Sequence, residues 1–421
     1  MLTLLIIADD FTGALDAGVQ FSKSGAVTRV VTDRDYDYGQ AGGDVQVLVM
    51  DAETRHLSAA EAYETVYAIA ARAVNHRIPH IYKKTDSALR GNIGSELAAL
   101  LAASGENGLP FFPAFPKMGR VTRAGYHYIG DVKVEDSVFG QDPYEPVRYS
   151  YIPELIRRQC SVRVRTIPVG KWAVTEGGEP EICVFDAQDD EYLRQLGESL
   201  CARGGLRIMA GCAGFAQVLP KLLKLEGSPP AAERMHERFL VVCGSINPIT
   251  VQQLDYAEKH GFLRFRMSPV QKLEGGYWDS LTGRETLKQW ERCMESSPYC
   301  IVDSSDPPGG RETAGYAREK GMSPEAIRKG VAGSLGRVLR ELLSDGLVCS
   351  MLLTGGDTLL ACMRQLGVKE MEPICEMGPG IVLSRFWSRG APCQVISKSG
   401  GFGGETLLTD LAGQICERGC V

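Results

Sequence analysis

The sequence predicts an α/β protein of two domains, each with a largely parallel sheet flanked by helices. Three observations lead to this prediction. Apolar runs alternate with helix-like segments over nearly the whole chain, as in repeated strand–helix–strand units. Many of the runs are apolar throughout, which is typical of strands covered on both faces. The chain has 421 residues, which is long for one hydrophobic core.

Strands are expected at the apolar runs, and helices are expected between them. The strand candidates are residues 2–8, 27–32, 45–50, 78–84, 110–114, 181–186, 207–211, 238–243, 299–303, 348–353 and 393–397. Besides a helix-like stretch after Phe11-Thr12-Gly13, the helix candidates are 58–76, 91–103, 189–203, 213–225, 247–260, 283–294, 324–344, 358–366 and 404–418. Residues 117–150 lack a helical period and are expected to form hairpins and a long loop.

One segment has the composition of a linker between two domains. It reads LEGSPPAAERMHERF, from Leu225 to Phe239, and combines Gly, Ser, two prolines and charged residues before a new apolar run. Gly, Pro and polar residues are typical of domain boundaries. We therefore expect one domain over residues 1–228 and a second over residues 236–421.

Composition and charge exclude several classes of partner and site. The net charge is −6, and no block of Lys and Arg stands out, so neither nucleic acid nor a membrane is an expected partner. No secretory signal and no run of about 18 apolar residues is visible. The 13 cysteines form no C-x-x-C pair and sit mostly in apolar runs, which favours reduced thiols in a cytoplasmic protein.

Charged residues follow the expected strands of the first half. The first strand ends at two adjacent carboxylates, Asp9 and Asp10. Asp51 and Arg55 follow the third apolar run, and YKKTDSALRGNIG follows the fourth, with Lys83, Lys84, Asp86, Ser87 and Arg90. Ligands of parallel α/β sheets bind at the carboxyl ends of the strands. Arginine can bind a carboxylate while aspartate binds hydroxyls, so the set suits a small polyol that carries its own acid group.

Glycine-rich or small-residue turns follow three expected strands of the second half. They read CGSINP with Gly244, Ser245 and Asn247, TGGDT with Gly355 to Thr358, and KSGGFGG at 398–404. Such turns expose backbone N–H groups and, at a helix N-terminus, hold phosphate. A sugar-like pocket in one half and a phosphate site in the other suggest phosphoryl transfer.

Each cluster alone also has a structural explanation. Asp9 and Asp10 could be helix-capping acids, TGGDT a tight turn with a cap, and His127 a structural histidine. His56 and His127 are the histidines nearest the strand ends, and neither has an obvious acidic partner in the sequence. The P-loop, dinucleotide, protein-kinase and G-x-S-x-G signatures are missing. The nucleotide site must therefore be of another type.

Five motifs together resemble the four-carbon acid sugar kinase family. They are IADDFTGALDAG, KKTDSALRGNIGSEL, PAFPKMGRVTRAGYHY, TGGDT and SKSGGFGGETLL, and they occur in order over nearly the whole chain. The resemblance implies a bacterial enzyme with an N-terminal acid-sugar domain and a C-terminal nucleotide domain. It also implies use of ATP to phosphorylate the terminal hydroxyl of tetronates such as threonate, erythronate or their oxo forms.

The resemblance implies site residues as well. Those expected to line the substrate site are Asp10, Arg55, Lys84, Asp86, Ser87 and Arg90. Those expected to hold ATP are Ser245, Gly355, Gly356, Asp357, Thr358, Gly400 and Gly401. We expect Asp10 to accept the proton of the attacking hydroxyl and Asp9 to be the reserve base or to organise Mg²⁺. The sequence identifies no metal ligands.

This chain departs from the common family pattern at three places. Ala14-Leu15-Asp16-Ala17 stands where Ala-Asn-Asp-Thr is frequent, Ala88 where Thr is common, and Ile246-Asn247 where Cys-Ser often precedes the proline. The first two changes remove hydrogen-bonding side chains near the expected sugar pocket, so they bear on which acid is the substrate.

The sequence favours a kinase that acts on O4 of D-threonate or D-erythronate. Two other interpretations stay open: a kinase of a 3-oxo-tetronate or another short sugar acid, and a sensor that binds nucleotide and sugar acid without turnover. An acid-sugar dehydrogenase is disfavoured by the missing dinucleotide fingerprint. The oligomeric state is also open, with a homo-oligomer as one expectation.

Overall fold

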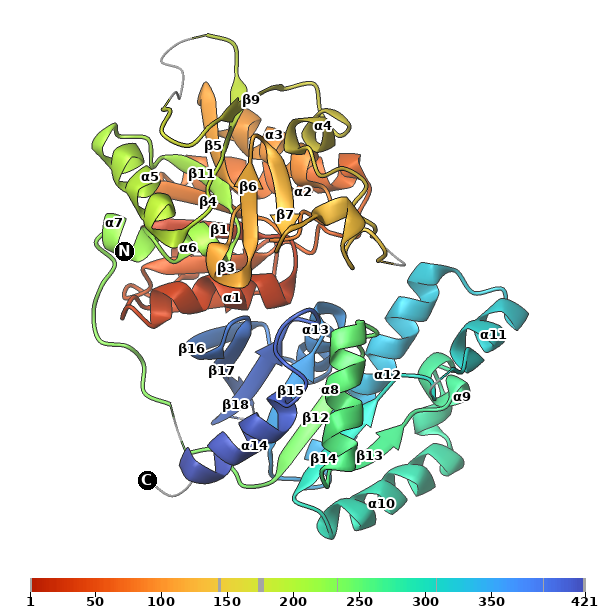
Figure 1. Cartoon of the computed structure of the whole chain (residues 1–421). Coiled ribbons are helices and arrows are strands. Elements are labelled where there is room, and N and C mark those ends of the chain that lie inside the picture. Colours follow the sequence, from red (N-terminus) through yellow and green to blue (C-terminus); the bar gives the residue numbers. More distant parts are fainter. Residues whose placement is uncertain are drawn as a thin grey trace. The chain divides into compact units, whose positions relative to one another are not determined.

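The chain forms two compact units, Met1–Pro230 and Ala231–Val421. The computed structural model describes residues 2–142, 145–172, 178–232, 234–307, 309–388 and 390–418, and shows helices around strands in each unit (Figure 1). Within these ranges, none of the helices has the length and apolar character needed to cross a membrane.

The sheet of the first unit is entirely parallel. Its strand order is β2-β3-β1-β4-β11-β5-β10-β9. The strands are β1 Leu4–Ala8, β2 Thr28–Val31, β3 Val47–Asp51, β4 His80–Lys84, β5 Gly108–Phe112, β9 Arg163–Ile167, β10 Glu181–Phe185 and β11 Ile208–Gly211. Strand β1 lies between β3 and β4, so the strand order reverses there. Such a switch point opens a ligand crevice at the carboxyl ends of the strands.

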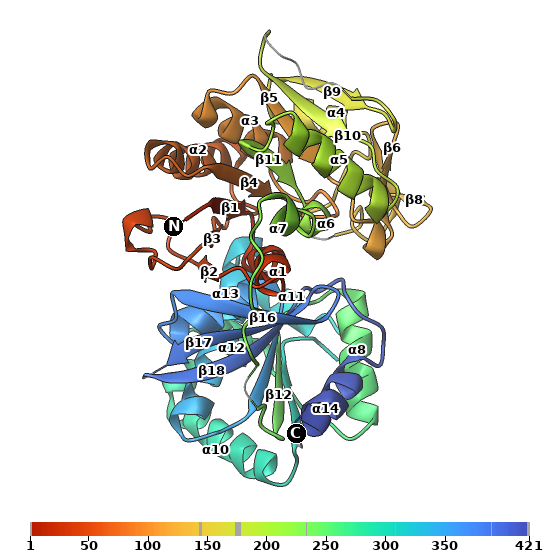
Figure 2. The same cartoon turned by 90° about the vertical axis from the view of Figure 1, so that its left-hand side faces the viewer.

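Two layers of helices accompany this sheet (Figure 2). In one layer α2 packs on α3 and α3 on α4; in the other α1 packs on α6 and α7, which contact α5. The helices are α1 Phe11–Ser22, α2 Ala59–Asn75, α3 Ile93–Ser104, α4 Ile152–Arg157, α5 Asp190–Ala202, α6 Ala213–Ala216 and α7 Leu219–Leu222. A small antiparallel sheet is formed by β6 Arg120–Arg123, β7 Tyr126–Ile129 and β8 Val132–Lys133.

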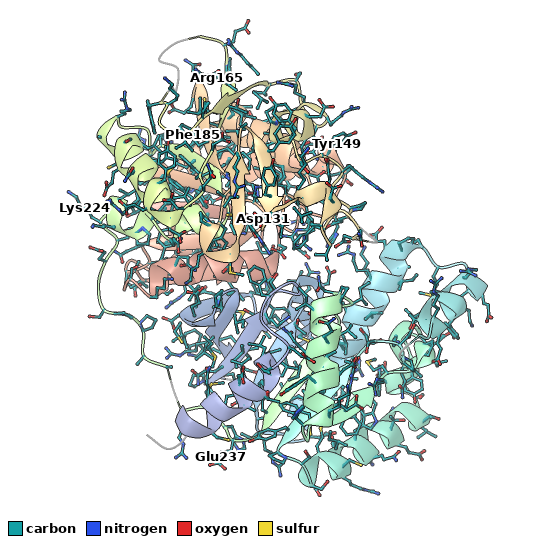
Figure 3. The ribbon with its side chains drawn as sticks, viewed as in Figure 1. Asp131, Tyr149, Arg165, Phe185, Lys224 and Glu237 are labelled. Carbon is teal, nitrogen blue, oxygen red and sulfur yellow. The ribbon has the colours of Figure 1, made fainter. Side chains whose placement is uncertain are left out.

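The interior of the first unit combines aromatic packing with one buried ion pair. Phe185, labelled in Figure 3, stacks on Phe112, which stacks in turn on Phe215. Nearer to β1, Lys83 and Glu96 are both fully buried, and Lys83 Nζ lies 3.0 Å from Glu96 Oε2. The same ammonium donates to the backbone carbonyls of Ile7 and Lys84. The pair therefore ties α3 to the two central strands.

The sheet of the second unit is mixed. Its order is β13-β14-β12-β15-β18-β17-β16, with β17 antiparallel to both of its neighbours and the other pairs parallel. The strands are β12 Phe239–Cys243, β13 Leu263–Arg266, β14 Tyr299–Asp303, β15 Ser350–Thr354, β16 Glu370–Gly378, β17 Ile381–Ser388 and β18 Ala391–Lys398. Strand β12 lies between β14 and β15 and marks a second switch point.

The helices of the second unit also form two groups. Helix α12 contacts α9, α10 and α13, whereas α8 contacts α14. Their bounds are α8 Pro248–Lys259, α9 Pro269–Leu273, α10 Leu281–Glu295, α11 Glu312–Glu319, α12 Pro324–Ser344, α13 Gly356–Gln365 and α14 Leu407–Arg418.

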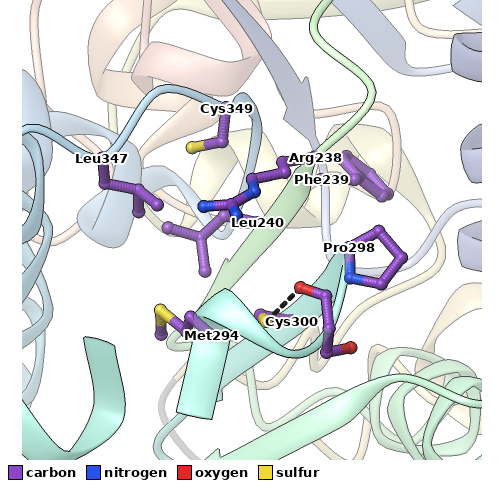
Figure 4. A pocket seen from close by; sticks show the side chains of 9 residues that line it. Arg238, Phe239, Leu240, Met294, Pro298, Cys300, Leu347 and Cys349 are labelled. Atoms are coloured by element: carbon purple, nitrogen blue, oxygen red, sulfur yellow. Dashed lines mark hydrogen bonds between the residues drawn. The ribbon is translucent and has the colours of Figure 1, made fainter. Parts of the chain in front are cut away.

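A small cavity of about 10 Å³ lies at the amino ends of β12, β14 and β15 (Figure 4). Cys300 and Cys349 line it, and burial raises their pKa values to about 11 and about 12. Both thiols therefore stay protonated at neutral pH. The cysteines in the described part of the chain are all free, as expected for reduced thiols.

The predicted fold class is confirmed, and all eleven predicted strands are present. The prediction of one helix over 213–225 is wrong, because Gln217 and Val218 separate the short helices α6 and α7. Strands β9, β13, β16 and β17 and helices α4, α9 and α11 were not predicted. Strands β9 and β13 are edge strands with alternating arginines, which a search for continuous apolar runs does not find.

The buried pair of Lys83 and Glu96 yields a stability prediction. Lys83→Met leaves an uncompensated buried carboxylate, so we expect the free energy of unfolding to fall by about 3–5 kcal/mol. The double change Lys83→Met/Glu96→Leu should regain most of this loss, because neither charge is then buried. Urea denaturation followed by circular dichroism measures both, with Arg158→Ala on the exposed Arg158–Glu154 pair as control. A loss below about 1 kcal/mol in Lys83→Met would contradict the structural role.

Candidate active site

The two carboxylates after β1 differ in their surroundings. Asp10 is the N-cap of α1 and accepts hydrogen bonds from the backbone N–H of Gly13 at 2.8 Å and from the hydroxyl of Thr12 at 2.8 Å. The side chain of Asp10 keeps 15% of its surface exposed, whereas that of Asp9 keeps 2%. Asp10 is therefore the more accessible carboxylate of this pair.

Arg55 bridges the two carboxylates. Its Nε and Nη2 each lie 2.8 Å from Asp9 Oδ2, and its Nη1 lies 2.8 Å from Asp10 Oδ2. The chain reaches this position because β3 runs beside β1, and the backbone N–H groups of Thr54 and Arg55 donate to the carbonyl of Asp9. One buried guanidinium thus offsets the repulsion between two adjacent acids.

The pKa shifts follow from these contacts. Burial opposes ionisation of Asp10, but Arg55 and Lys84 outweigh it and lower the pKa. The pKa of the neighbouring Asp51 is raised well above its ordinary value, first by burial and then by the charges of Glu53 and Asp10. These surroundings therefore favour the ionised form of Asp10 and the protonated form of Asp51.

The loop after β4 brings a third carboxylate to the site. Asp86 receives two bonds from the guanidinium of Arg90, at 3.0 Å from Nε and 2.8 Å from Nη2, and lies 3.6 Å from Arg55 Nη2. Although Asp86 is buried, Arg90 and Arg55 hold its pKa well below the usual range. Leu89 has a φ of 65°, a strained conformation for a non-glycine residue that is common at functional sites.

The other two predicted residues of this loop, Lys84 and Ser87, have different partners. Lys84 donates to the carbonyl of Thr85 at 2.9 Å and lowers the pKa of Asp10. Ser87 receives a short hydrogen bond from the buried guanidinium of Arg120 on β6. Arg120 and Arg90 both stack on the ring of Phe139. The sequence did not single out Arg120, because it lies beyond the strand-end loops of the main sheet.

Neither histidine near the site is free to act as a base. His127 is fully buried, with Nε2 2.9 Å from the carbonyl of Ser87 and Nδ1 3.3 Å from Thr122 Oγ1. Burial lowers its pKa to about 4, so it stays neutral and positions Ser87. The expectation that His56 lacks an acidic partner is wrong, because its Nδ1 pairs with Glu145. The sequence could not show this pairing across 89 positions.

A cleft of about 280 Å³ opens beside Arg90. Arg148 and Arg158 also line it, together with Tyr149, which is labelled in Figure 3 and lies under the guanidinium of Arg158. Three guanidinium groups and the amide of Asn92 make this cleft suitable for an acidic, hydroxylated ligand.

In the second unit, the loops after β12, β15 and β18 come together. A methyl group on Gly400 would lie 2.8 Å from Ser245 Oγ, so a larger residue there would have to displace this hydroxyl. Gly355, the N-cap of α13, has a φ of 98°, and its N–H donates to the carbonyl of Lys398. The φ value lies in the region that favours glycine.

Two helix N-termini begin at these loops. Helix α8 is capped by Asn247, whose Oδ1 accepts from the backbone N–H of Ile249. Helix α13 starts at Gly356 and has no side-chain cap, which leaves its first N–H groups for a ligand. Helix N-termini with glycine loops bind phosphate. Gly401 follows Gly400 in the same turn.

The two side chains after Gly356 have protein partners. Asp357 pairs with Arg328 of α12, at 2.5 Å from Nη1 to Oδ1. Thr358 is buried, and its Oγ1 would lie 2.1 Å from a methyl group on Gly244. Thr358 therefore packs beneath the loop after β12, and Arg328 was not predicted because α12 carries no motif.

The departures from the family pattern lie in the protein interior or at a cap, except for Ile246, which is exposed. Leu15, Ala17 and Ala88 are fully buried. Asn247 provides the N-cap of α8, a role that suits Asn as well as Ser. The described residues contain no group of three or more His, Cys, Asp or Glu side chains arranged for a metal ion.

Two family models match this chain. The model described as a sugar-binding N-terminal domain matches residues 4–219, about half of the chain. The model described as a nucleotide-binding C-terminal domain matches residues 240–408.

Curated relatives align over almost their full length. A D-threonate kinase of Salmonella typhimurium is 28% identical over 100% of both chains. A D-erythronate kinase of Heliobacterium modesticaldum is 28% identical over 90% of this chain and 89% of the relative. A 3-oxo-tetronate kinase of Methylobacterium radiotolerans is 26% identical over 96% and 97%.

Solved structures share the fold. A Salmonella typhimurium protein described as a tRNA synthase gives a TM-score of 0.75 at 23% identity, over 98% of this chain and 99% of that one. The Haemophilus influenzae protein HI1011 gives 0.68 at 21% identity, over 97% and 99%. At these identities the likeness supports the fold alone. With the two family models and the curated relatives, the conclusion is that this chain belongs to the four-carbon acid sugar kinase family, whose members are phosphotransferases with an alcohol group as acceptor.

Proposed function

We propose that this enzyme transfers the γ-phosphoryl group of ATP to O4 of D-threonate or D-erythronate. The observation that carries the proposal is the cluster of Asp10, Arg55, Asp86 and Arg90 at the switch point of the first unit. It combines a reachable carboxylate with guanidinium groups, which suits a hydroxylated acid. We assign sugar-acid binding to residues 1–228 and ATP binding to residues 236–421.

Asp10 is our candidate for the group that accepts the hydroxyl proton. It is ionised at neutral pH, and its side chain is more exposed than those of Asp9 and Asp86. Asp86 is held by Arg90 through two hydrogen bonds, and both ring nitrogens of His127 face protein atoms. Phosphoryl transfer asks chiefly for positioning of the nucleophile and for charge stabilisation, which Asp10 and its cationic neighbours supply.

The carboxylate of the substrate is proposed to bind at the cleft beside Arg90. Arg55 is occupied by Asp9 and Asp10, so its role is to organise those acids rather than to bind the substrate acid alone. Arg90 shares its guanidinium between Asp86 and the cleft that it lines with Arg148. Of the two arginines, we therefore propose Arg90 as the main contact to the substrate carboxylate.

Mg²⁺ is proposed to accompany ATP. Magnesium in kinases is commonly held by one or two carboxylates, phosphates and waters, so a cluster of three protein acids is not required. Asp9 Oδ1 is buried and has no hydrogen-bond partner among the described residues, which fits a metal ligand. The ion would offset the charge of the phosphates, and Asp9 is the residue that would hold it.

An ADP-release screen tests the proposed function. The panel comprises D-threonate, D-erythronate and their 3-oxo forms, with glycerate and free tetroses as controls for chain length and acid group. We expect turnover with D-threonate or D-erythronate above all others, and phosphorus NMR should place the phosphate on O4. Greater turnover with a 3-oxo acid would instead identify the enzyme as a 3-oxo-tetronate kinase. Nucleotide binding without turnover on any acid would support a sensor instead.

Removing the proposed base should lower turnover more than substrate binding. Asparagine at position 10 can still cap α1 through an amide oxygen but cannot accept the proton. Asp10→Asn should therefore reduce kcat by about 10²–10⁴, with a smaller change in the KM for the acid. Asp9→Asn is the matched variant, and we expect it to raise the Mg²⁺ concentration that gives half-maximal activity. Steady-state kinetics across a Mg²⁺ titration gives both values. Near-normal kcat in Asp10→Asn would contradict its role.

Shortening Arg90 should weaken binding of the acid. Arg90→Ala removes a charge-assisted contact worth roughly 1.5–3 kcal/mol, or about tenfold to a hundredfold in affinity. Arg90→Lys should recover only part of this loss because lysine lacks the planar fork. Calorimetric titration with the acid measures the affinity, and Arg163→Ala on the exposed edge strand β9 is the control. Equal affinity of Arg90→Ala and wild type for the acid would show that Arg90 does not bind the substrate.

A further inference from the structure

Among the described residues, three lysines are at most 1% exposed, and one of them differs from the other two. Lys83 pairs with Glu96, and Lys272 pairs with Asp306 at 2.7 Å. Lys398, at the end of β18, is 1% exposed, and its ammonium contacts only neutral oxygens in the described part of the chain. A buried charge without a counter-charge is costly, so its retention calls for an explanation.

The acceptors of Lys398 belong to the nucleotide loops. Its Nζ donates to Thr250 Oγ1 at 3.0 Å and to the carbonyls of Ser399 and Gly400 at 3.3 and 3.2 Å. Thr250, in the first turn of α8, donates to the carbonyl of Gly400 at 2.7 Å. Its Oγ1 also lies 3.5 Å from Ser245 Oγ. One ammonium and one hydroxyl therefore link the loops after β12 and β18.

The backbone of Lys398 reaches the third loop. Its carbonyl accepts from the N–H of Gly355 at 3.2 Å, so the turn that starts α13 is fixed to the same residue. The nearest acid at the end of a parallel strand, Asp303, is on β14, with β12 and β15 between it and β18. Asp303 also pairs with Arg264 at 2.6 Å, so it is not the counter-charge of Lys398.

We propose that Lys398 is a positioning residue of the nucleotide site: together with Thr250 it holds the three loops, and its buried positive charge is offset by the phosphates of a bound nucleotide. The proposal rests on the proposed use of ATP. It explains why a lysine without a carboxylate partner lies beneath glycine-rich loops whose N–H groups also favour anions.

The protonation of Lys398 gives this role a measurable signature. Burial lowers its pKa to about 8. The groups that surround it do not titrate near that value: α8 presents Thr250, β15 and β17 pair with it through Thr354 and Ile381, and β12 presents Cys243. Burial raises the pKa of the Cys243 thiol to about 12.

The sign of the pH effect follows from linkage. A polyphosphate binds better to the protonated lysine, so its affinity should fall as pH rises above the pKa of the free enzyme, by up to about tenfold per pH unit. The terminal phosphate of ADP has a second pKa of about 6, so most of it is fully charged at about pH 7. Its remaining ionisation would strengthen binding to a cation as pH rises, which is opposite in sign to the effect expected of Lys398.

The test is calorimetric titration of the full chain with ADP at about pH 7 and about pH 9. Wild type should bind more weakly at the higher pH. Lys398→Met should bind about tenfold more weakly at the lower pH and show no further loss at the higher one. Thr250→Val removes an acceptor of the ammonium, so its loss of affinity should begin at a lower pH than in wild type. Lys272→Met, the matched buried lysine, should keep the wild-type pH dependence.

Two outcomes overturn the proposal. Equal ADP affinity of wild type at both pH values contradicts it even when Lys398→Met does not fold, and so does a pH dependence that persists in Lys398→Met. These outcomes leave the proposed function intact because ADP still binds. If wild type bound no ADP at either pH, the proposed use of ATP would fail together with this inference.

Discussion

The contact between Arg55 and the carboxylates of Asp9 and Asp10 is the interaction on which the first site depends. Two adjacent acids at the end of a buried strand repel each other and lose hydration. Arg55 offsets the repulsion and replaces part of the lost hydration, because its guanidinium lies 2.8 Å from each carboxylate. It can do so because β3 lies beside β1, although the residues are 45 and 46 positions apart in the chain. The parallel sheet thus determines the electrostatics of the site.

The two units use the same architectural position for different chemistry. In each, a central strand, β1 or β12, lies where the strand order reverses. The loops of the first unit present charged side chains, and those of the second present glycine backbone and helix N-termini. Charged side chains suit a hydroxylated acid, whereas backbone N–H groups suit phosphate. This division of chemistry accords with the two family models, which describe a sugar-binding and a nucleotide-binding domain.

The sequence was sufficient to predict the central strands and the loops that follow them. Runs such as Phe239–Cys243 are apolar on both faces, and the residues after them lie at the sheet edge where ligands bind. It was not sufficient for edge strands such as β9, in which exposed arginines alternate with other residues. Nor could it identify pairs of side chains, because pairing depends on strand order. The pairing of His56 with Glu145 and the contact of Arg120 with Ser87 are examples.

The central claim is that Arg55 keeps Asp10 ionised and available to the substrate hydroxyl. The most direct measurement is a ¹³C NMR titration of the Asp10 carboxyl carbon, identified by its loss in Asp10→Asn, in wild type and in Arg55→Met. Removal of the guanidinium takes away the largest contribution that lowers the pKa of Asp10. We therefore predict that this carboxyl titrates at a higher pH in Arg55→Met than in wild type, and that the acid limb of kcat moves with it. An unchanged titration in the folded variant would contradict the claim.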